Sequence, residues 1–130
     1  MRALADRLAD GQDEIVERIT YQLSAYRPCG ATLLGPAEIT GRIALLVGDF
    51  IESLHTRRVA PFVDRVRAMA EEGPEGERLA GAELQTALDL LEDLALQSVT
   101  ERTGLTPPEA SFAIRSLVDA GRSALPAETR

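Results

Sequence analysis

The strongest constraint on the fold is a broad apolar stripe at helical spacing in the first half of the chain. Gly35 can serve as the N-cap of a helix, Pro36 suits its first position, and Glu38 follows in the first turn. The apolar residues of this stripe are Ile39, Ile43, Leu46, Val47, Phe50, Ile51 and Leu54. A stripe of this width predicts a buried helix at the centre of the fold.

The same spacing recurs on either side of this central helix. It predicts one long helix over about residues 3–26, with Gly11 as a point where the helix can flex. Pro61 places the start of a third helix close to itself, because proline is tolerated only in the first turn. The inner face of that helix consists of Phe62, Val63, Val66, Met69 and Ala70, and the segment EEGPEGE ends it.

Two further helices complete the expected set. A fourth helix runs from about Ala82 to Thr103, and Gly104 is a natural residue to end it. We expect Leu84, Leu88, Leu91, Leu94 or Ala95, and Val99 to face inward, and Glu83, Asp89, Glu92 and Asp93 to face outward. The segment Thr106 to Glu109 forms a capping box that begins the last helix. Its buried stripe is Ala110, Ala113, Ile114, Leu117, Val118 and Leu125.

Composition supports an all-α fold in one domain of about five main helices. The 130 residues are 45% hydrophobic but only 4% aromatic, and no segment shows strand-like alternation. The one cysteine, Cys29, cannot form an internal disulfide, and no stretch approaches the roughly 20 apolar residues of a membrane span. The N-terminal segment is too acidic and amphipathic for a secretion signal. We therefore expect a cytoplasmic protein that makes no contact with membranes.

Charge argues against nucleic acid as a partner. The net charge is −7, whereas affinity for phosphates comes from basic side chains. Residues 101–121 nevertheless show the pattern of a DNA-binding helix-turn-helix, in which a helix end and a glycine turn are followed by a second amphipathic helix. The residues that would reach the base edges are Pro107, Pro108, Glu109 and Ser111, and the only basic residues of this helix are Arg115 and Arg122. We keep a helix-turn-helix transcriptional regulator as an alternative function.

Candidate chemical groups are few. His55 is the only histidine, which excludes a site with two histidine ligands, although one histidine can be the proximal ligand of a haem. A haem-binding gas sensor that uses His55 is therefore a second alternative. No P-loop, G-x-G-x-x-G, C-x-x-C or H-E-x-x-H motif is present. We expect no enzymatic activity, no metal and no resident cofactor.

Charged clusters have simpler interpretations. The glutamates at positions 71, 72, 75 and 77 surround Gly73-Pro74 and are typical of a solvated turn. The only concentration of basic residues is Arg57-Arg58 with Arg65 and Arg67, which can meet an acidic partner, although Asp64 dilutes it.

Four stretches together carry a family resemblance. They are LADRLADGQDEIVERITYQLSAY, ITGRIALLVGDFIESLHT, VAPFVDRVRAMAEEG and LQTALDLLEDLALQSV. The chain resembles the N-terminal sensory domains of RsbR-type stressosome proteins and of some bacterial histidine kinases. That resemblance implies a globin-like helical fold, frequent absence of haem, homodimerisation, and transmission of a signal through the last helix to an output domain or a downstream signalling protein. The family supplies no catalytic residue.

The resulting hypothesis is a non-enzymatic sensory or regulatory domain of bacterial signal transduction. We expect it to act through dimerisation and other protein–protein contacts, either by itself or as the N-terminal part of a longer protein. Because terminal helices are free to pack against a second copy, we expect the dimer to use exposed apolar positions of the first and last helices.

Overall fold

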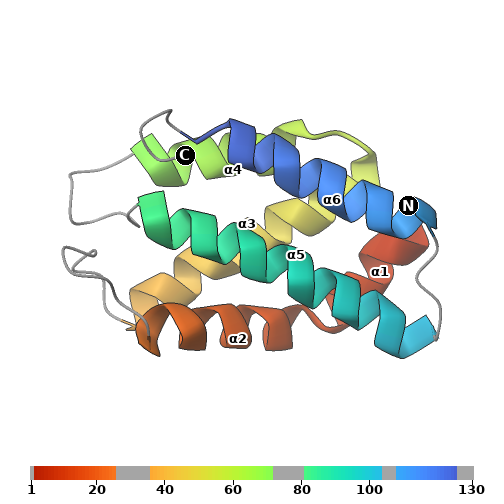
Figure 1. Ribbon diagram of the computed structural model, residues 1–130, viewed down its shortest axis with the longest axis horizontal. Coiled ribbons are helices and arrows are strands. Elements are labelled where there is room, and N and C mark those ends of the chain that lie inside the picture. The colour runs from red at the N-terminus through yellow and green to blue at the C-terminus, as the bar shows by residue number, and fades with distance from the viewer. Residues whose placement is uncertain (1, 26–35, 72–80, 104–107, 126–130) are drawn as a thin grey trace.

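The computed structural model describes residues 2–25, 36–71, 81–103 and 108–125, and every regular element in these ranges is a helix (Figure 1). The elements are α1 (Arg2–Asp10), α2 (Gln12–Ala25), α3 (Pro36–Thr56), α4 (Ala60–Glu71), α5 (Gly81–Thr103) and α6 (Pro108–Ser123). The prediction of an all-α fold is confirmed for this part of the chain. Within the same ranges, no helix combines the length and the apolar character needed to span a membrane.

The N-terminal segment forms two helices instead of one. The N–H of Gly11 donates to the carbonyl oxygen of Leu8 (3.2 Å) at the end of α1, and its carbonyl oxygen accepts from the N–H of Ile15 (3.1 Å) at the start of α2. From Gly11 the two helices run in different directions (Figure 1). The prediction of one helix over residues 3–26 is therefore wrong, and the described ranges hold six helices where about five were expected.

Helix α3 is the central helix that its apolar stripe predicts. It packs against α1, α2, α4 and α6. All of the predicted inner residues are buried except Ile51, which is half-buried. The buried side chains of all six helices form one hydrophobic cluster, so burial of apolar surface in this cluster is the main stabilising contribution to the fold.

Helix α5 packs against α1, α2 and α6, and it lies beside α6 in the opposite direction (Figure 1). The prediction that Glu83 faces outward is wrong, because this residue is only 1% exposed. Glu83, Ala87 and Leu91 follow one another at a spacing of four residues, so they share one face of α5. That face is buried, and the carboxylate lies in the first turn, where the helix dipole favours negative charge.

Helix α4 is held between α3 and α6 by Phe62. The rings of Phe62 and Phe50 meet edge to face, with their centroids 5.2 Å apart. On the other side, a Cβ atom at Gly121 would lie 2.5 Å from Cε2 of Phe62. Glycine at position 121 is therefore required for the close approach of α6 to α4.

Candidate functional site

An open groove lies between the end of α3 and one face of α6, with a volume of about 520 Å³. We call it the α3–α6 groove. One wall is the last turn of α3 and the turn that leads into α4, and the other wall is the first half of α6. The lining residues are Ser53, Leu54, Arg57, Arg58, Val59, Glu109, Phe112, Ala113, Ser116 and Leu117.

The surface of this groove is mainly apolar. Phe112 of α6 is 75% exposed and Val59 is 55% exposed, whereas Leu54 and Leu117 beside them belong to the buried core. Phe112 is exposed because it lies out of phase with the inner stripe of α6, which includes Ala110. Contiguous exposed apolar surface with a polar rim is typical of a site of protein–protein contact.

The turn beside the groove is fixed by two helix ends. Arg57 adopts the left-handed conformation, with φ of 59°, and the N–H of Arg58 donates to the carbonyl oxygen of Ser53 (3.1 Å). This is the Schellman arrangement that closes many helices, and glycine is the usual residue at the left-handed position. An arginine there costs about 1 kcal/mol in backbone conformation.

The hydroxyl of Ser53 then stabilises the start of α4. Its Oγ accepts a hydrogen bond from the N–H of Phe62 (2.9 Å), and Ser53 is only 2% exposed. The residue before α4 is Val59, whose side chain has no oxygen, so Ser53 of the preceding helix takes the role of an N-cap side chain. The path of residues 57–59 is thereby fixed on both sides of the turn.

The predicted basic concentration divides into two pairs of arginines. Arg65 forms an ion pair with Asp49 of α3 (2.7 Å), and Arg67 lies 3.8 Å from Asp64 in its own helix. Arg57 and Arg58 are exposed at the rim of the α3–α6 groove, and within the described residues neither forms an ion pair.

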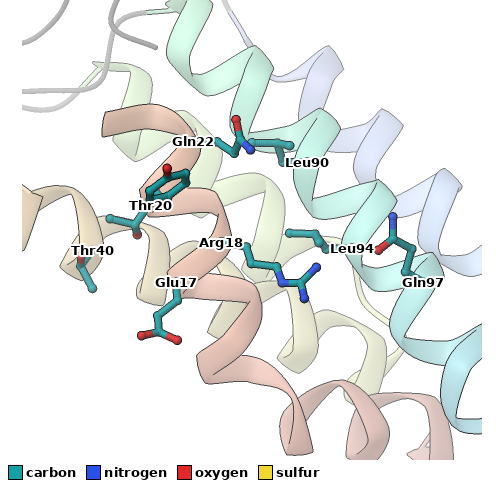
Figure 2. Close-up of a pocket in the computed structure, with 9 residues that line it drawn as sticks. Glu17, Arg18, Thr20, Gln22, Thr40, Leu90, Leu94 and Gln97 are labelled. Carbon is teal, nitrogen blue, oxygen red and sulfur yellow. The ribbon is translucent and has the colours of Figure 1, made fainter. Parts of the chain in front are cut away.

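A second groove, of about 700 Å³, lies between α2 and α5. Figure 2 shows Leu90 and Leu94 of α5 opposite Arg18 and Gln22 of α2. Within the described ranges Glu17 is the only acidic residue that lines it, and Arg18 is already paired with Glu14 (2.9 Å). Among the residues that the structure describes, neither a histidine nor a cysteine lines this groove, and no cluster of three or more groups suited to a metal ion occurs.

His55, the candidate haem ligand, is exposed in the last turn of α3. It does not line either of these two grooves. At that place an imidazolium would interact favourably with the helix dipole. The haem alternative stays a prediction. Cys29 and the glutamates at positions 72, 75 and 77 lie outside the described residues, whereas Glu71 is exposed at the end of α4.

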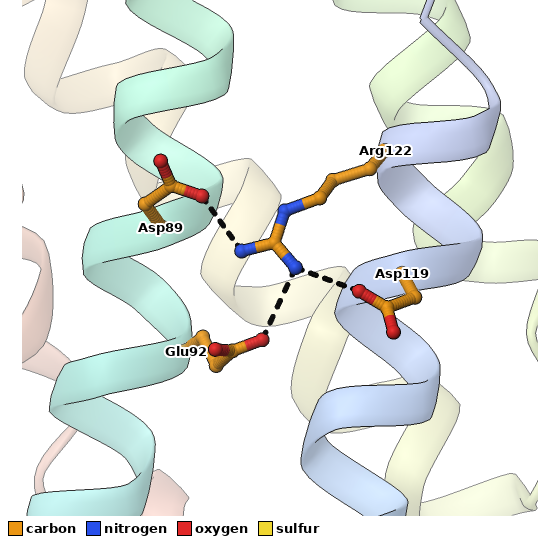
Figure 3. Close-up of polar contacts among 4 residues, drawn as sticks. All are labelled: Asp89, Glu92, Asp119 and Arg122. Atoms are coloured by element: carbon orange, nitrogen blue, oxygen red, sulfur yellow. Dashed lines mark hydrogen bonds and ion pairs between the residues drawn. The ribbon is translucent and has the colours of Figure 1, made fainter.

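Arg122, one of the two basic residues of the suspected DNA-reading helix, joins α6 to α5. Figure 3 shows its guanidinium between the two helices, where it donates to Asp89 (2.6 Å), Asp119 (2.7 Å) and Glu92 (3.2 Å). Burial by itself lowers the pKa of this guanidinium, but the hydrogen bonds to Asp89 and Asp119, together with the negative charges of Glu92 and Asp89, outweigh burial and raise the pKa above its ordinary value.

These contacts bear on the helix-turn-helix alternative. Arg122 is held by carboxylates of its own domain, so a phosphate would have to displace them. Glu109 is exposed in the first turn of α6, where it would repel phosphate, and Arg115 is exposed further along the helix. The residues that would form the turn, 104–107, lie outside the described residues.

Neither Phe112 nor Val59 is among the surface features expected from the sequence. For Phe112 a signal was present, since it is a large aromatic residue outside the inner stripe of its helix. For Val59 the sequence holds no such signal, because its exposure depends on the turn geometry.

Comparisons with known protein families, with curated proteins and with solved structures find no match to this chain.

Proposed function

We propose that this protein is a non-enzymatic sensory or regulatory domain of bacterial signal transduction, which acts through protein–protein contacts. The observation that carries the proposal is the α3–α6 groove, where the fold leaves Phe112 and Val59 in solvent beside the core. A large exposed aromatic side chain in an apolar groove is typical of a binding hot spot. The family resemblance of the sequence supplies the signalling context and a globin-like arrangement of the helices.

Self-association is the second part of the proposal. Tyr21 of α2 is 71% exposed and Phe112 of α6 is 75% exposed, so exposed aromatic residues occur in the N-terminal helices and in the last described helix. We assign homodimerisation to the surface around Tyr21, and contact with an output domain or a downstream signalling protein to the α3–α6 groove.

Selection of displayed peptides tests the role of the groove without assuming a partner. Peptides that bind the Phe112→Ser variant are first removed from a random library, and the remaining peptides are then selected on the wild-type domain. Because Phe112 is largely exposed, this variant should fold, which circular dichroism verifies. We expect enriched peptides that bind the wild type and lose at least about tenfold in affinity on Phe112→Ser, the size of effect that removal of a hot spot produces.

Leu45→Ser is the matched control, because Leu45 is 52% exposed on α3 but does not line the groove. It should leave peptide affinity unchanged. A library that yields no peptide dependent on Phe112 would contradict the proposed function.

Sedimentation equilibrium tests self-association. We expect the wild type to form a dimer whose dissociation constant rises in Tyr21→Ser. A wild type that stays monomeric at every accessible concentration would contradict the dimer.

A further inference from the structure

The lining of the α3–α6 groove differs in charge from the rest of the protein. The chain has a net charge of −7, yet the charged residues that line the groove, counted over the part of the chain that the structure describes, are two arginines and one glutamate. Arg57 and Arg58 are on the wall formed by the turn, and Glu109 is on the wall formed by α6. The groove is therefore a locally positive apolar surface on an acidic domain.

The left-handed backbone at Arg57 is a second, independent observation. This position closes α3, and glycine or asparagine would occupy it with less strain. Its side chain is exposed, and within the described residues it forms no ion pair. Residues in strained conformations cluster at binding sites, so this arginine at a glycine position indicates that its charge has a role outside the domain.

From these observations we infer that the α3–α6 groove binds an acidic amphipathic segment of a partner protein. This inference rests on the proposed function and names the chemistry of its partner. A large apolar side chain of the partner enters the groove between Val59 and Phe112, and flanking aspartates or glutamates pair with Arg57 and Arg58. A volume of about 520 Å³ accommodates the apolar face of a short helix.

Other occupants fit the charges less well. Two copies that faced each other across a two-fold axis would bring four of these arginines together with only two glutamates, and both copies carry −7. An extended polyanion such as nucleic acid would meet the acidic surface beyond the groove. A short acidic segment meets only the groove itself.

The test uses the composition of the peptides selected on the wild-type domain after depletion on Phe112→Ser. We expect aspartate or glutamate to be enriched on both sides of an apolar anchor. A consensus peptide is then synthesised with a fluorophore, and its affinity is measured by fluorescence anisotropy at low and high salt. High salt should weaken binding, because the paired charges are exposed.

Variants of Arg57 and Arg58 at the rim distinguish the effect of lost charge from the effect of impaired folding. Arg57→Asn and Arg58→Gln should each weaken the consensus peptide about threefold, and the double variant about tenfold, as expected for exposed ion pairs. Arg57→Lys keeps the charge and should stay within about twofold of the wild type. Arg115→Gln is the matched control, because Arg115 is an exposed arginine of α6 that does not line the groove.

Arg57→Gly adds a readout that a purely structural role would not give. Glycine relieves the left-handed backbone, so the melting temperature should equal that of the wild type or exceed it by up to about 3 °C, while peptide affinity falls. A variant that loses both stability and affinity would overturn the inference.

The outcomes are distinguishable. Peptides that depend on Phe112 but have neutral or basic flanks, with unchanged affinity on Arg57→Asn and Arg58→Gln, overturn the inference and leave the proposed function standing. A dimer that dissociates on Phe112→Ser makes a second copy the occupant, and this also overturns the inference. The absence of any peptide dependent on Phe112 contradicts the proposed function itself.

Discussion

The two ends of α6 differ in how their side chains are used. Near the C-terminal end, Gly121 leaves room for the ring of Phe62 of α4, and Arg122 donates hydrogen bonds to three carboxylates, two of them on α5. Near the N-terminal end, Phe112 and Glu109 face an open groove. The C-terminal end of α6 is thus held by packing and hydrogen bonds, whereas its N-terminal end lines a groove that is open to solvent. Residues that stabilise the fold and residues available for binding therefore lie at opposite ends of one helix.

Gly121→Ala should have the largest effect on stability and would sharpen this comparison most. The new Cβ would lie 2.5 Å from Cε2 of Phe62, and that ring is fully buried against Phe50. Overpacking of this kind should lower the free energy of unfolding by about 2 kcal/mol. Urea denaturation measures it. Gly41→Ala is the control, since its Cβ meets nothing within 4 Å and should leave stability equal or higher. Equal stability of Gly121→Ala and the wild type would contradict the close approach.

Ser53→Ala tests the hydrogen bond that stabilises the start of α4 beside the α3–α6 groove. It removes the acceptor for the N–H of Phe62 at a site that is 2% exposed. Loss of such a cap should cost about 1.5 kcal/mol, measured by thermal and urea denaturation. An unchanged melting temperature would mean that this serine does not stabilise the start of α4.

Arg122→Gln tests how much the ion pairs near the C-terminal end of α6 contribute to stability. Its side chain is 27% exposed and its partners Asp89 and Asp119 are mostly exposed, so the network should contribute only about 1 kcal/mol to stability. The difference from the wild type should shrink at high salt.

The effect of Arg122 should not depend on pH near neutrality. A raised pKa of a guanidinium gives stability that is complete below the pKa of the unfolded chain and disappears only in strong alkali. Arg115→Gln, at the exposed arginine of the same helix, should change stability little. If both variants lost the same stability, the contrast between the two arginines would be wrong.

Phe112→Ser should have the smallest effect on stability. The side chain is 75% exposed and lies outside the buried cluster. Its removal should change the free energy of unfolding by less than about 0.5 kcal/mol. Urea denaturation beside the peptide measurements checks this. A large loss of stability would place Phe112 in the core and break the distinction between the two ends.

The sequence predicts most of the core but not every break in a helix. The stripe of α3 and the start of α4 beside Pro61 follow from helical spacing and from the chemistry of proline. The sequence marks Gly11 as a point of flexure but does not show that the helix ends there, because Leu4, Leu8, Ile15 and Ile19 keep one phase across it. Periodicity reports which face is buried, and it does not report whether the axis stays straight.

The candidate site was predictable only in part. The basic concentration around Arg57 and Arg58 is visible in the sequence, but pairing between helices decides which arginines remain available, as with Arg65 and Asp49. Similarly, the burial of Glu83 and the close approach at Gly121 depend on neighbouring helices. Local patterns therefore define elements, whereas the groove comes from their packing.

A titration of the ¹⁵N-labelled domain with the selected consensus peptide, followed by NMR, tests the central claim most directly. The account predicts amide shift changes concentrated at residues 53–59 and 109–117, the segments that form the α3–α6 groove. Changes concentrated around Arg122 and α5, or along the α2–α5 groove, would contradict it.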